Sequence, residues 1–448
     1  MRDYFFAMLI GVIVLMACAR PFVGVLLWSW ISFMSVHRLT WGVVTNLPWA
    51  ILAFGATLVG CLIAREPKRL RVTGIMVLLL MFGIGITITT FTALTDPHGA
   101  WQKWDKIIKI VIGLLLTGVL LTERWRIHAL IWLIVISLGY FGVRGGLFTI
   151  LTGGGHIVLG PPDSMIADRN HLAVALLFAI PLINWLRMHS AHRIVQIGLL
   201  ASMPLMLFAA IGTQSRGALV AVAGVAVLLW LRTPGKIVSG IGIALAVALV
   251  VTFMPDSWVQ RMQTIRDFEG DRSAMGRLDI WHTSFVIALA RPLTGGGFLA
   301  MYQGHIVDMF TPGITPRAAH SIYFEVIGEH GFVIFGLWLA IIGLGIYYTM
   351  QLTALGKNRP SLRWAADLGR MSQVSIAAYL IGGAFLSLSY WDCFWTLIVV
   401  LGAARAIALE EVCQGQAPVV AGRPARAAGP GALPGWRDRP VTARTARG

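Results

Sequence analysis

The chain has 448 residues, of which 57% are hydrophobic and 12% are charged, and its mean hydropathy is +0.76. A soluble protein carries roughly 25% charged residues, so this composition excludes a soluble globular domain. The formal net charge of +16 is spread over short loops and the C-terminal tail. That distribution is typical of cytoplasmic loops in a membrane protein, and we expect no nucleic-acid partner.

Apolar runs recur from one end of the chain to the other, separated by short polar connections. Their length predicts an all-α polytopic membrane protein, because a transmembrane barrel would show alternating segments of about 10 residues instead. The runs fall at residues 3–18, 22–36, 47–64, 72–94, 107–122, 127–150, 170–188, 193–211, 217–232, 236–254, 321–350, 371–388 and 393–409.

Basic loops orient these segments. Lys and Arg gather in short cytoplasmic loops, and five basic connections are mutually consistent with alternating crossings: residues 65–71, 123–126, 187–193, 232–236 and 357–370. The remaining connections then fall on the other side: residues 95–106, 151–169, 212–216, 255–320 and 389–392.

The first two apolar runs are each short for a full span, and Arg20-Pro21 separates them. We expect them to make one crossing together, which gives about 12 transmembrane helices with both ends cytoplasmic. The chain then divides into four parts: N-terminal transmembrane helices at 1–254, a large periplasmic loop at 255–320, C-terminal transmembrane helices at 321–410, and a disordered cytoplasmic tail at 411–448.

The periplasmic loop contains a predicted amphipathic helix at 276–290. Its apolar residues recur at helical spacing, which is typical of a helix lying on the membrane surface. These residues are Leu278, Trp281, Phe285 and Leu289.

The stretch from Arg317 to Gly336 places His320, Glu325, Glu329 and His330 on the approach to an apolar helix. A neutral imidazole is well matched to taking a proton near pH 7, which makes His320 a candidate general base. The plain alternative is that polar residues collect at helix ends because water is there. His330 lies ten residues further along, roughly 15 Å on a helix, so we expect it to have a packing or capping role.

Two arginines are candidate anion-binding residues. Arg216 stands at the start of a predicted span after a very short outer turn, where free N–H groups favour an anion. Arg277 is expected at the start of the amphipathic helix, where its charge opposes the helix dipole unless an anion or Asp279 offsets it. Snorkelling to the interface is the alternative for Arg216.

Four further residues on the same side carry polar groups. Asp168 or Asn170 can cap the helix that begins near residue 170, and capping alone could account for both. Arg169 lies between them, and Arg144 sits near the outer end of its span, where an ionisable group is a functional candidate.

Several catalytic and metal-binding motifs are missing. The sequence has no P-loop, no H-E-x-x-H, no G-x-S-x-G and no D-x-D, and its four cysteines lack C-x-x-C spacing. We therefore expect no metal and no cofactor. Phosphate chemistry without metal ligands would rely on arginine for charge stabilisation.

Several short motifs occur in a fixed order and on a common side of the membrane: Thr213 to Leu219, Gly276-Arg277 with Ile280-Trp281, Gly295 to Phe298, and His320-Ser321 with Gly331. Together they resemble the bacterial O-antigen ligase family, inner-membrane enzymes of GT-C-like helical architecture. The start of the chain, with Trp28-Ser29-Trp30 and His37 to Gly42, is similar to the O-glycosylation ligases found with exosortase systems. One departure is Ser321, where many relatives have asparagine.

The resemblance implies a metal-independent, inverting transfer at the periplasmic face of the inner membrane. The donor would be a glycan on undecaprenyl diphosphate, and the acceptor would be a hydroxyl of lipid A–core oligosaccharide. His320 would act as the base, and Arg216 and Arg277 would bind the diphosphate. Supporting roles would fall to Arg144, Arg169, Asn170, Ser215, Ser321, Tyr323 and Glu325.

Other functions stay open at this stage. An O-antigen polymerase or a protein O-oligosaccharyltransferase would use the same donor with another acceptor. A lipid-linked sugar transporter belongs to a different class and predicts ionisable residues at mid-span, whereas the middles of most spans here are uncharged. A purely structural scaffold would leave the outer arginines and His320 without a reason.

Overall fold

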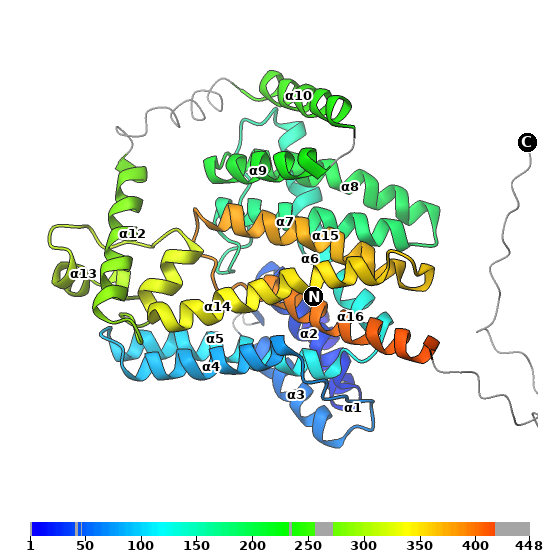
Figure 1. Cartoon of the computed structure of the whole chain (residues 1–448), viewed down its shortest axis with the longest axis horizontal. Coiled ribbons are helices and arrows are strands. Elements are labelled where there is room, and N and C mark those ends of the chain that lie inside the picture. Colours follow the sequence, from blue (N-terminus) through cyan, green and yellow to red (C-terminus); the bar gives the residue numbers. More distant parts are fainter. Residues whose placement is uncertain (1, 41–43, 46, 233–234, 256–271, 417–448) are drawn as a thin grey trace, which may run out of the picture.

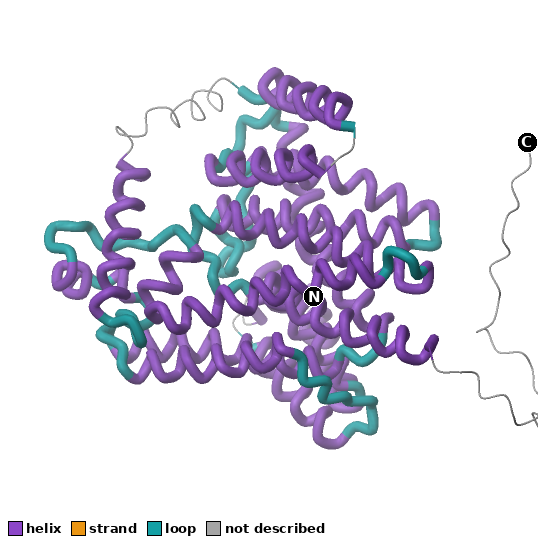
Figure 2. Tube along the Cα trace, viewed as in Figure 1, coloured by secondary structure: helices purple, strands orange, loops and turns teal. Residues whose placement is uncertain are grey.

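The computed structural model describes residues 2–40, 44–45, 47–232, 235–255 and 272–416. Within these ranges the chain is helical and contains no strand (Figure 2). The predicted all-α fold is therefore confirmed for the described part. Most of the predicted tail, residues 417–448, lies outside the described residues, whereas residues 411–416 continue the last helix.

Every predicted apolar segment overlaps a helix. The described helices are α1 (Arg2–Ala19), α2 (Pro21–Met34), α3 (Trp49–Ile63), α4 (Gly74–Phe91), α5 (Pro97–Leu120), α6 (Arg124–Leu151), α7 (Arg169–His189), α8 (Arg193–Gly212), α9 (Arg216–Arg232), α10 (Lys236–Phe253), α12 (Arg272–Ala290), α13 (Gly304–Phe310), α14 (Ile322–Leu355), α15 (Arg363–Gly383) and α16 (Asp392–Gln416). Short 3₁₀ turns η1 (Val36–Leu39), η3 (Ala300–Tyr302) and η4 (Pro360–Leu362) join some of them.

Six of the described helices are long and apolar enough to cross a membrane, namely α4, α6, α7, α8, α14 and α16. Two of them form the centre of the bundle, because 72% of the span in α7 and 83% of that in α16 is buried, against 22% in α8. The chain is thus a multi-pass membrane protein with an enclosed central pair. The total of about 12 crossings stays a prediction.

The first two helices form a hairpin. Phe6 of α1 contacts Trp49 at the start of α3, and Ala17 lies against Gly60 near its end, so α1 and α3 run in the same direction. Gly24, early in α2, contacts Thr57, late in α3, so α2 runs back. This arrangement differs from the single joint crossing that the sequence suggested for residues 3–36.

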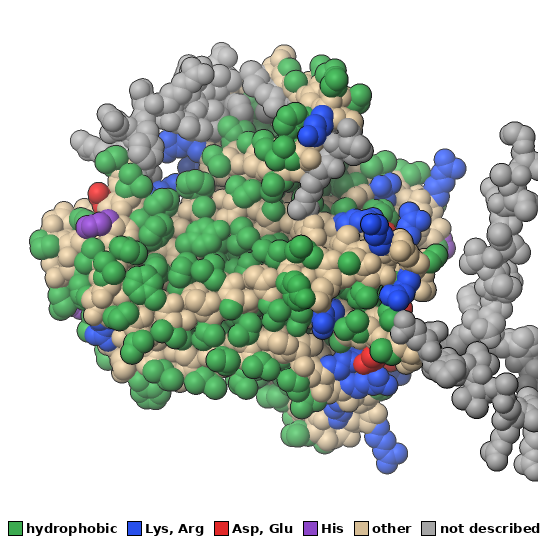
Figure 3. Space-filling view, viewed as in Figure 1, with side chains coloured by type: hydrophobic (Ala, Val, Ile, Leu, Met, Phe, Trp, Pro, Cys, Tyr) green, Lys and Arg blue, Asp and Glu red, His purple; other side chains and the backbone are tan. Residues whose placement is uncertain are grey.

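Four of the five basic loops meet at one end of the bundle. Arg71 forms an ion pair with Glu410 near the end of α16 at 2.7 Å and donates to the carbonyl of Thr122 at 3.2 Å. Arg126 pairs with Glu66 at 2.7 Å. The end of α7 reaches the start of α15 through His189 and Asp367, 3.3 Å apart. Figure 3 shows lysine and arginine gathered at the right-hand end of the visible face.

The other connections meet at the opposite end. The carbonyl of Gly212 accepts from the N–H of Val158 at 3.0 Å, and the N–H of Leu94 donates to Gly296 at 2.9 Å. Figure 1 shows α12 standing across this end of the long helices, with α13 beside it. The alternation of loops predicted from charge is therefore present in the fold, and all the candidate site residues except Arg144 lie in or near these connections.

Candidate functional site

The helix that follows His320 is interrupted by a glycine. α14 departs from helical geometry at Gly331, where φ is +74° and ψ is −174°. The segment Gly295–Gly297 fills the break, because the N–H of Gly296 donates to Gly328 at 2.9 Å and that of Gly297 donates to Glu329 at 2.8 Å. A β-carbon on Gly295 would lie 2.6 Å from the backbone nitrogen of Gly331. The sequence predicted a continuous segment at 321–350 and not this break.

His320 stands at the entry to α14 in a left-handed conformation, with φ at +46°. Residues other than glycine adopt this region at a cost of about 1 kcal/mol or more, and such positions cluster at functional sites. Two contacts fix the conformation: the N–H of His320 donates to Ser387 Oγ at 3.0 Å, and Trp281 Nε1 donates to the carbonyl of Ala319 at 2.6 Å. His320 is half-buried.

The surroundings of His320 favour its neutral form. Burial lowers the pKa of His320 below 6.5, and the positive charges of Arg277 and His171 lower it further. The carboxylates of Asp168 and Glu325 act in the opposite direction without reversing the shift. At pH 7 the imidazole is therefore neutral and able to accept a proton.

The starts of α7 and α9 are joined beside this histidine. Ser215 Oγ donates to Asn170 Oδ1 at 2.5 Å and accepts the N–H of Ala218 at 3.0 Å, so Ser215 caps α9. Asp168 caps α7 by accepting the N–H of Asn170 at 2.8 Å, which confirms one of the two capping residues expected there. Burial would raise the pKa of Asp168, but the hydrogen bonds from Asn170 hold it below its usual range.

This joint places Arg169 and Arg216 at the first positions of two neighbouring helices. The first turn of a helix presents unpaired N–H groups and partial positive charge, so two such ends side by side favour an anion. Both side chains already have interactions within the protein. Arg216 is half-buried, and its neighbour Gly217 contacts Phe385, whose ring lies 6.4 Å from that of Trp281 on α12.

Arg277 does not open its helix as the sequence predicted. α12 begins at Arg272, so Arg277 lies in the second turn, and the expected conflict with the helix dipole does not apply. The predicted apolar stripe is real, with Phe285 at 43% and Leu289 at 59% exposed, while Ile280 and Ile287 on the opposite face are fully buried. The buried face packs against the segment that leads to His320, which brings Arg277 near the imidazole.

A third arginine, Arg317, lies beside Arg277. A β-carbon on Gly276 would be 2.0 Å from Nη1 and 2.5 Å from Cζ of Arg317, so this guanidinium lies directly on the backbone of α12. Arg317 is half-buried, its N–H donates to Met301 at 2.9 Å, and no described carboxylate lies within ion-pair distance of its side chain. No motif in the sequence marks Arg317 as a candidate site residue.

The comparisons with known proteins agree with this geometry. Residues 201–339 match a family model described as O-antigen ligase, and the match contains Arg216, Arg277 and His320. This match supports membership of the O-antigen ligase family. Residues 1–191 match a family of unknown function (DUF5935). A search of curated proteins found no match.

Membership of the O-antigen ligase family supports a glycosyl-transfer role of the ligase or polymerase type. It also implies lipid-linked glycan and acceptor substrates in the membrane, and a place in lipopolysaccharide biosynthesis. The matched region contains the Gly295–Gly297 segment, the glycine break in α14 and Trp281, whereas Ser387, which accepts the N–H of His320, lies outside it.

Glu325, a predicted supporting residue of this domain, belongs to a buried polar cluster below His320. Its carboxylate accepts Ser389 Oγ at 2.5 Å and pairs with Lys103 Nζ at 3.3 Å. The same ammonium lies 2.9 Å from Glu329, which also accepts the hydroxyl of Tyr390 at 2.7 Å. The cluster ties α5 and α14 to the turn that precedes α16. No motif in the sequence points to Lys103, Ser389 or Tyr390.

The remaining predicted residues occupy different environments, some next to His320 and others in the packed interior or on the surface. Ser321 is buried and occupies the position before α14, and the hydroxyl of Tyr323 donates to the carbonyl of Leu380 at 3.0 Å. His330 is fully buried, with Nδ1 2.6 Å from Thr89 Oγ1. Arg144 is exposed on α6, and no contact between described residues joins it to the other candidates. The structure therefore does not bring Arg144 into the site.

Proposed function

We propose that the chain is an inner-membrane O-antigen ligase that transfers a glycan from undecaprenyl diphosphate to a hydroxyl of lipid A–core oligosaccharide. The observation that carries this proposal is the placement of a neutral, conformationally fixed His320 near Arg277 within the O-antigen ligase domain, with Arg317 packed against Gly276. A base next to guanidinium groups is the arrangement that transfer from a diphosphate donor requires.

In the proposed reaction, the acceptor oxygen attacks the anomeric carbon while His320 takes the hydroxyl proton. The new carbon–oxygen bond forms as the bond from the anomeric carbon to the diphosphate breaks, and the diphosphate leaves with the electron pair. A single displacement of this kind inverts the anomeric configuration. The donor's own diphosphate bond supplies the driving force, so no nucleotide enters the reaction.

The arginines would hold the leaving diphosphate. Arg277 lies on α12, the side chain of Arg317 packs against the same helix at Gly276, and Arg216 lies at the start of α9 on the same end of the bundle. A guanidinium can give two parallel hydrogen bonds to a phosphate, and its charge offsets the negative charge that develops on the leaving oxygen. The proposal assigns this task to arginine instead of to a metal ion.

The positions of the basic loops support a periplasmic site. Arg71 and Arg126 hold the basic loops at the end of the bundle opposite to His320. Lys- and Arg-rich loops face the cytoplasm in the inner membrane, and the proposal therefore assigns the end with His320, α12 and α13 to the periplasm. The donor would then meet the enzyme after it has been moved to the outer leaflet.

The deciding experiment uses purified protein in detergent or lipid with EDTA present. It receives undecaprenyl-diphosphate-linked glycan and lipid A–core, and the products are separated on a gel. We expect a ladder of heavier glycolipid that is lost in His320→Ala. Lengthening of the donor alone would replace this proposal with an O-antigen polymerase, and transfer that needs an added pilin-like protein would replace it with a protein O-oligosaccharyltransferase.

A further inference from the structure

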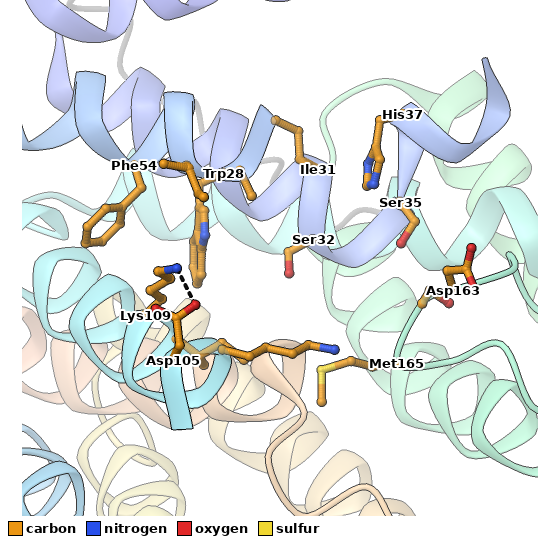
Figure 4. A pocket seen from close by; sticks show the side chains of 15 residues that line it. Trp28, Ile31, Ser32, Ser35, His37, Phe54, Asp105, Lys109, Asp163 and Met165 are labelled. Atoms are coloured by element: carbon orange, nitrogen blue, oxygen red, sulfur yellow. Dashed lines mark hydrogen bonds and ion pairs between the residues drawn. The ribbon is translucent and has the colours of Figure 1, made fainter. Parts of the chain in front are cut away.

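A cavity of about 310 Å³ lies between α2, α3 and α5, away from His320 (Figure 4). All of its lining residues fall within the region that matches the family of unknown function, and none belongs to the matched O-antigen ligase domain. Nothing in the proposed transfer uses this cavity. It is lined by Trp28, Ile31, Ser32, Ser35, His37, Ala50, Ile51, Phe54, Asp105, Lys106, Lys109, Ile110, Asp163, Ser164 and Met165.

The cavity has one apolar and one polar side. Trp28, Ile31 and Phe54 reach into it from α2 and α3, and Asp105 and Lys109 lie across from them on α5 (Figure 4). A pocket with mainly apolar walls and a few polar groups suits a ligand that has an apolar body and a polar head.

Three of the charged side chains that line the cavity form direct ion pairs, and within the described residues Lys106 does not. Lys109 pairs with Asp105 at 2.5 Å, and Asp163 pairs with Arg38 at 3.5 Å. Lys106 has no hydrogen bond or ion pair from its side chain to any residue of the described chain.

Two other polar groups border the cavity. Asp392 accepts the hydroxyl of Ser32 and the N–H of Cys393, and its carboxylate interacts with the charge of Lys106 without forming a direct ion pair. Burial and the charge of Arg38 lower the pKa of His37, so this imidazole is neutral at pH 7. The cavity therefore offers an ammonium that makes no direct ion pair with a described residue.

The position of Lys106 favours a ligand at the membrane interface. This lysine is exposed and ends the predicted outer connection 95–106, about 14 Å along α5 from Pro97. A long lysine side chain at such a position reaches the interface, where anionic lipid headgroups lie. Ile51 lines the cavity and is 54% exposed, so the mouth opens on the apolar outer surface of α3.

We infer that this cavity binds the phosphate headgroup of a membrane lipid, with the lipid phosphate on Lys106 and the lipid chain leaving past Ile51 over α3. The hydroxyls of Ser35 and Ser164 and the ring of His37 supply neutral hydrogen-bonding groups around the head. The region of unknown function thus holds a lipid at a second place, separate from the arginines at the other site.

The test measures lipids retained by the purified full-length protein with native mass spectrometry. The probes are undecaprenyl phosphate, phosphatidylglycerol, the neutral alcohol undecaprenol and inorganic phosphate. We expect a lipid that carries phosphate to bind at least tenfold more tightly than undecaprenol, since a hydrogen bond to a charged group contributes about 1.5–3 kcal/mol. Whichever phosphate lipid binds more tightly identifies the source, and inorganic phosphate alone should bind weakly.

Variants make the assignment specific. Lys106→Gln should lose about tenfold in affinity for the phosphate lipid, and Ala50→Phe should fill the cavity and lose binding while keeping the charge. Lys357→Gln, which removes a lysine from the loop at the opposite end of the bundle, should bind like wild type. His320→Ala should also keep lipid binding, so a failure of the transfer proposal leaves this test intact.

Two results would overturn the inference. One is equal retention of undecaprenol and undecaprenyl phosphate, which would make the cavity a site for lipid chains alone. The other is unchanged affinity in both Lys106→Gln and Ala50→Phe, which would show that Lys106 merely extends to the interface.

Discussion

The guanidinium of Arg317 lies against the backbone of Gly276, at a place where any other residue would put a β-carbon 2.0 Å from Nη1. The missing side chain at position 276 therefore makes the space in which a third arginine approaches Arg277. This gives a physical reason for the glycine that precedes Arg277 in the sequence, and it leads to a test that leaves all three arginines in place.

Gly276→Ala should move Arg317 and impair transfer without unfolding the protein. The clashing atoms are the far end of a flexible side chain, which can swing away at low cost. We expect kcat/KM to fall roughly tenfold, the size of one lost hydrogen bond to a charged group, with little change in Tm. Gly304→Ala is the matched control, since its nearest neighbour would lie 3.7 Å away. Full activity in Gly276→Ala would exclude a role for Arg317.

Replacing Arg216 with lysine should reduce kcat/KM about tenfold to a hundredfold. Lysine keeps the positive charge but cannot give two parallel hydrogen bonds to a phosphate, and such bonds contribute about 1.5–3 kcal/mol. The measurement is transfer rate against donor concentration in matched detergent. Arg144→Lys serves as the control because Arg144 is exposed on α6 and outside the site. If both variants work like wild type, snorkelling is the better account of Arg216.

The pH dependence of kcat/KM should report on His320. Burial and the charge of Arg277 lower its pKa below 6.5, so the neutral base persists at lower pH than for a free imidazole. Activity should stay level from neutral pH down to about 6.5 and fall only when the pH drops through the lowered pKa. In Arg277→Gln one lowering cause is removed, and the acid limb should move upward. An acid limb centred above 6.5 in the wild type would contradict the assignment.

Gly295→Ala should destabilise the protein, because Gly295 has φ at +60° and its β-carbon would meet the backbone of Gly331 and His330 at 2.6 Å. Overpacking against backbone that cannot move costs typically about 1–3 kcal/mol, in addition to the strain of the left-handed conformation. A thermal melt in detergent should show a lower Tm. Gly336→Ala is the control in α14, the helix against which Gly295 packs. A β-carbon at position 336 would have open space around it, so this variant should melt at the same temperature as wild type or slightly higher. Equal Tm values for the two variants would refute the idea that the close packing of Gly295 against Gly331 stabilises the fold.

The helices, and the loops that share one end of the bundle, could be predicted from the sequence. Long apolar runs predict helices because the membrane leaves few alternatives, and the charges of Arg71 and Arg126 marked loops that do meet at one end. The sequence also predicted His320 and Arg277 as site residues, because each stands in a short motif, and their roles stay predictions. Their proximity depends on the tertiary fold, in which Trp281 of α12 donates to the carbonyl of Ala319.

The parts that the sequence did not predict depend on distant partners. Lys103 looks like an ordinary charge near the start of a helix, and only packing of α5 on α14 brings it to Glu325 and Glu329. The break at Gly331 was missed because one glycine in an apolar run is compatible with a helix, and the segment that fills the break lies far earlier in the chain. The start of α12 was placed too late because Gly276 was taken as its first residue.

Lys103→Met should be the most destabilising single change in the polar cluster. The ammonium is 19% exposed and lies between Glu325 at 8% and Glu329 at 0%, so its removal leaves two enclosed carboxylates without a cation. Loss of one partner from a buried ion pair costs about 3–5 kcal/mol. Equilibrium unfolding in mixed micelles should show this loss, and the second substitution Glu329→Gln should recover part of it by removing one of the stranded charges.

Lys109→Met is the matched control on the same helix. Its partner Asp105 is 55% exposed and Lys109 itself is 41% exposed, so solvent screens this pair and the variant should unfold nearly like wild type. A loss in Lys103→Met no larger than in Lys109→Met would mean that water or a shift of α5 already compensates Glu325 and Glu329. The cluster would then have no part in holding α14 below His320.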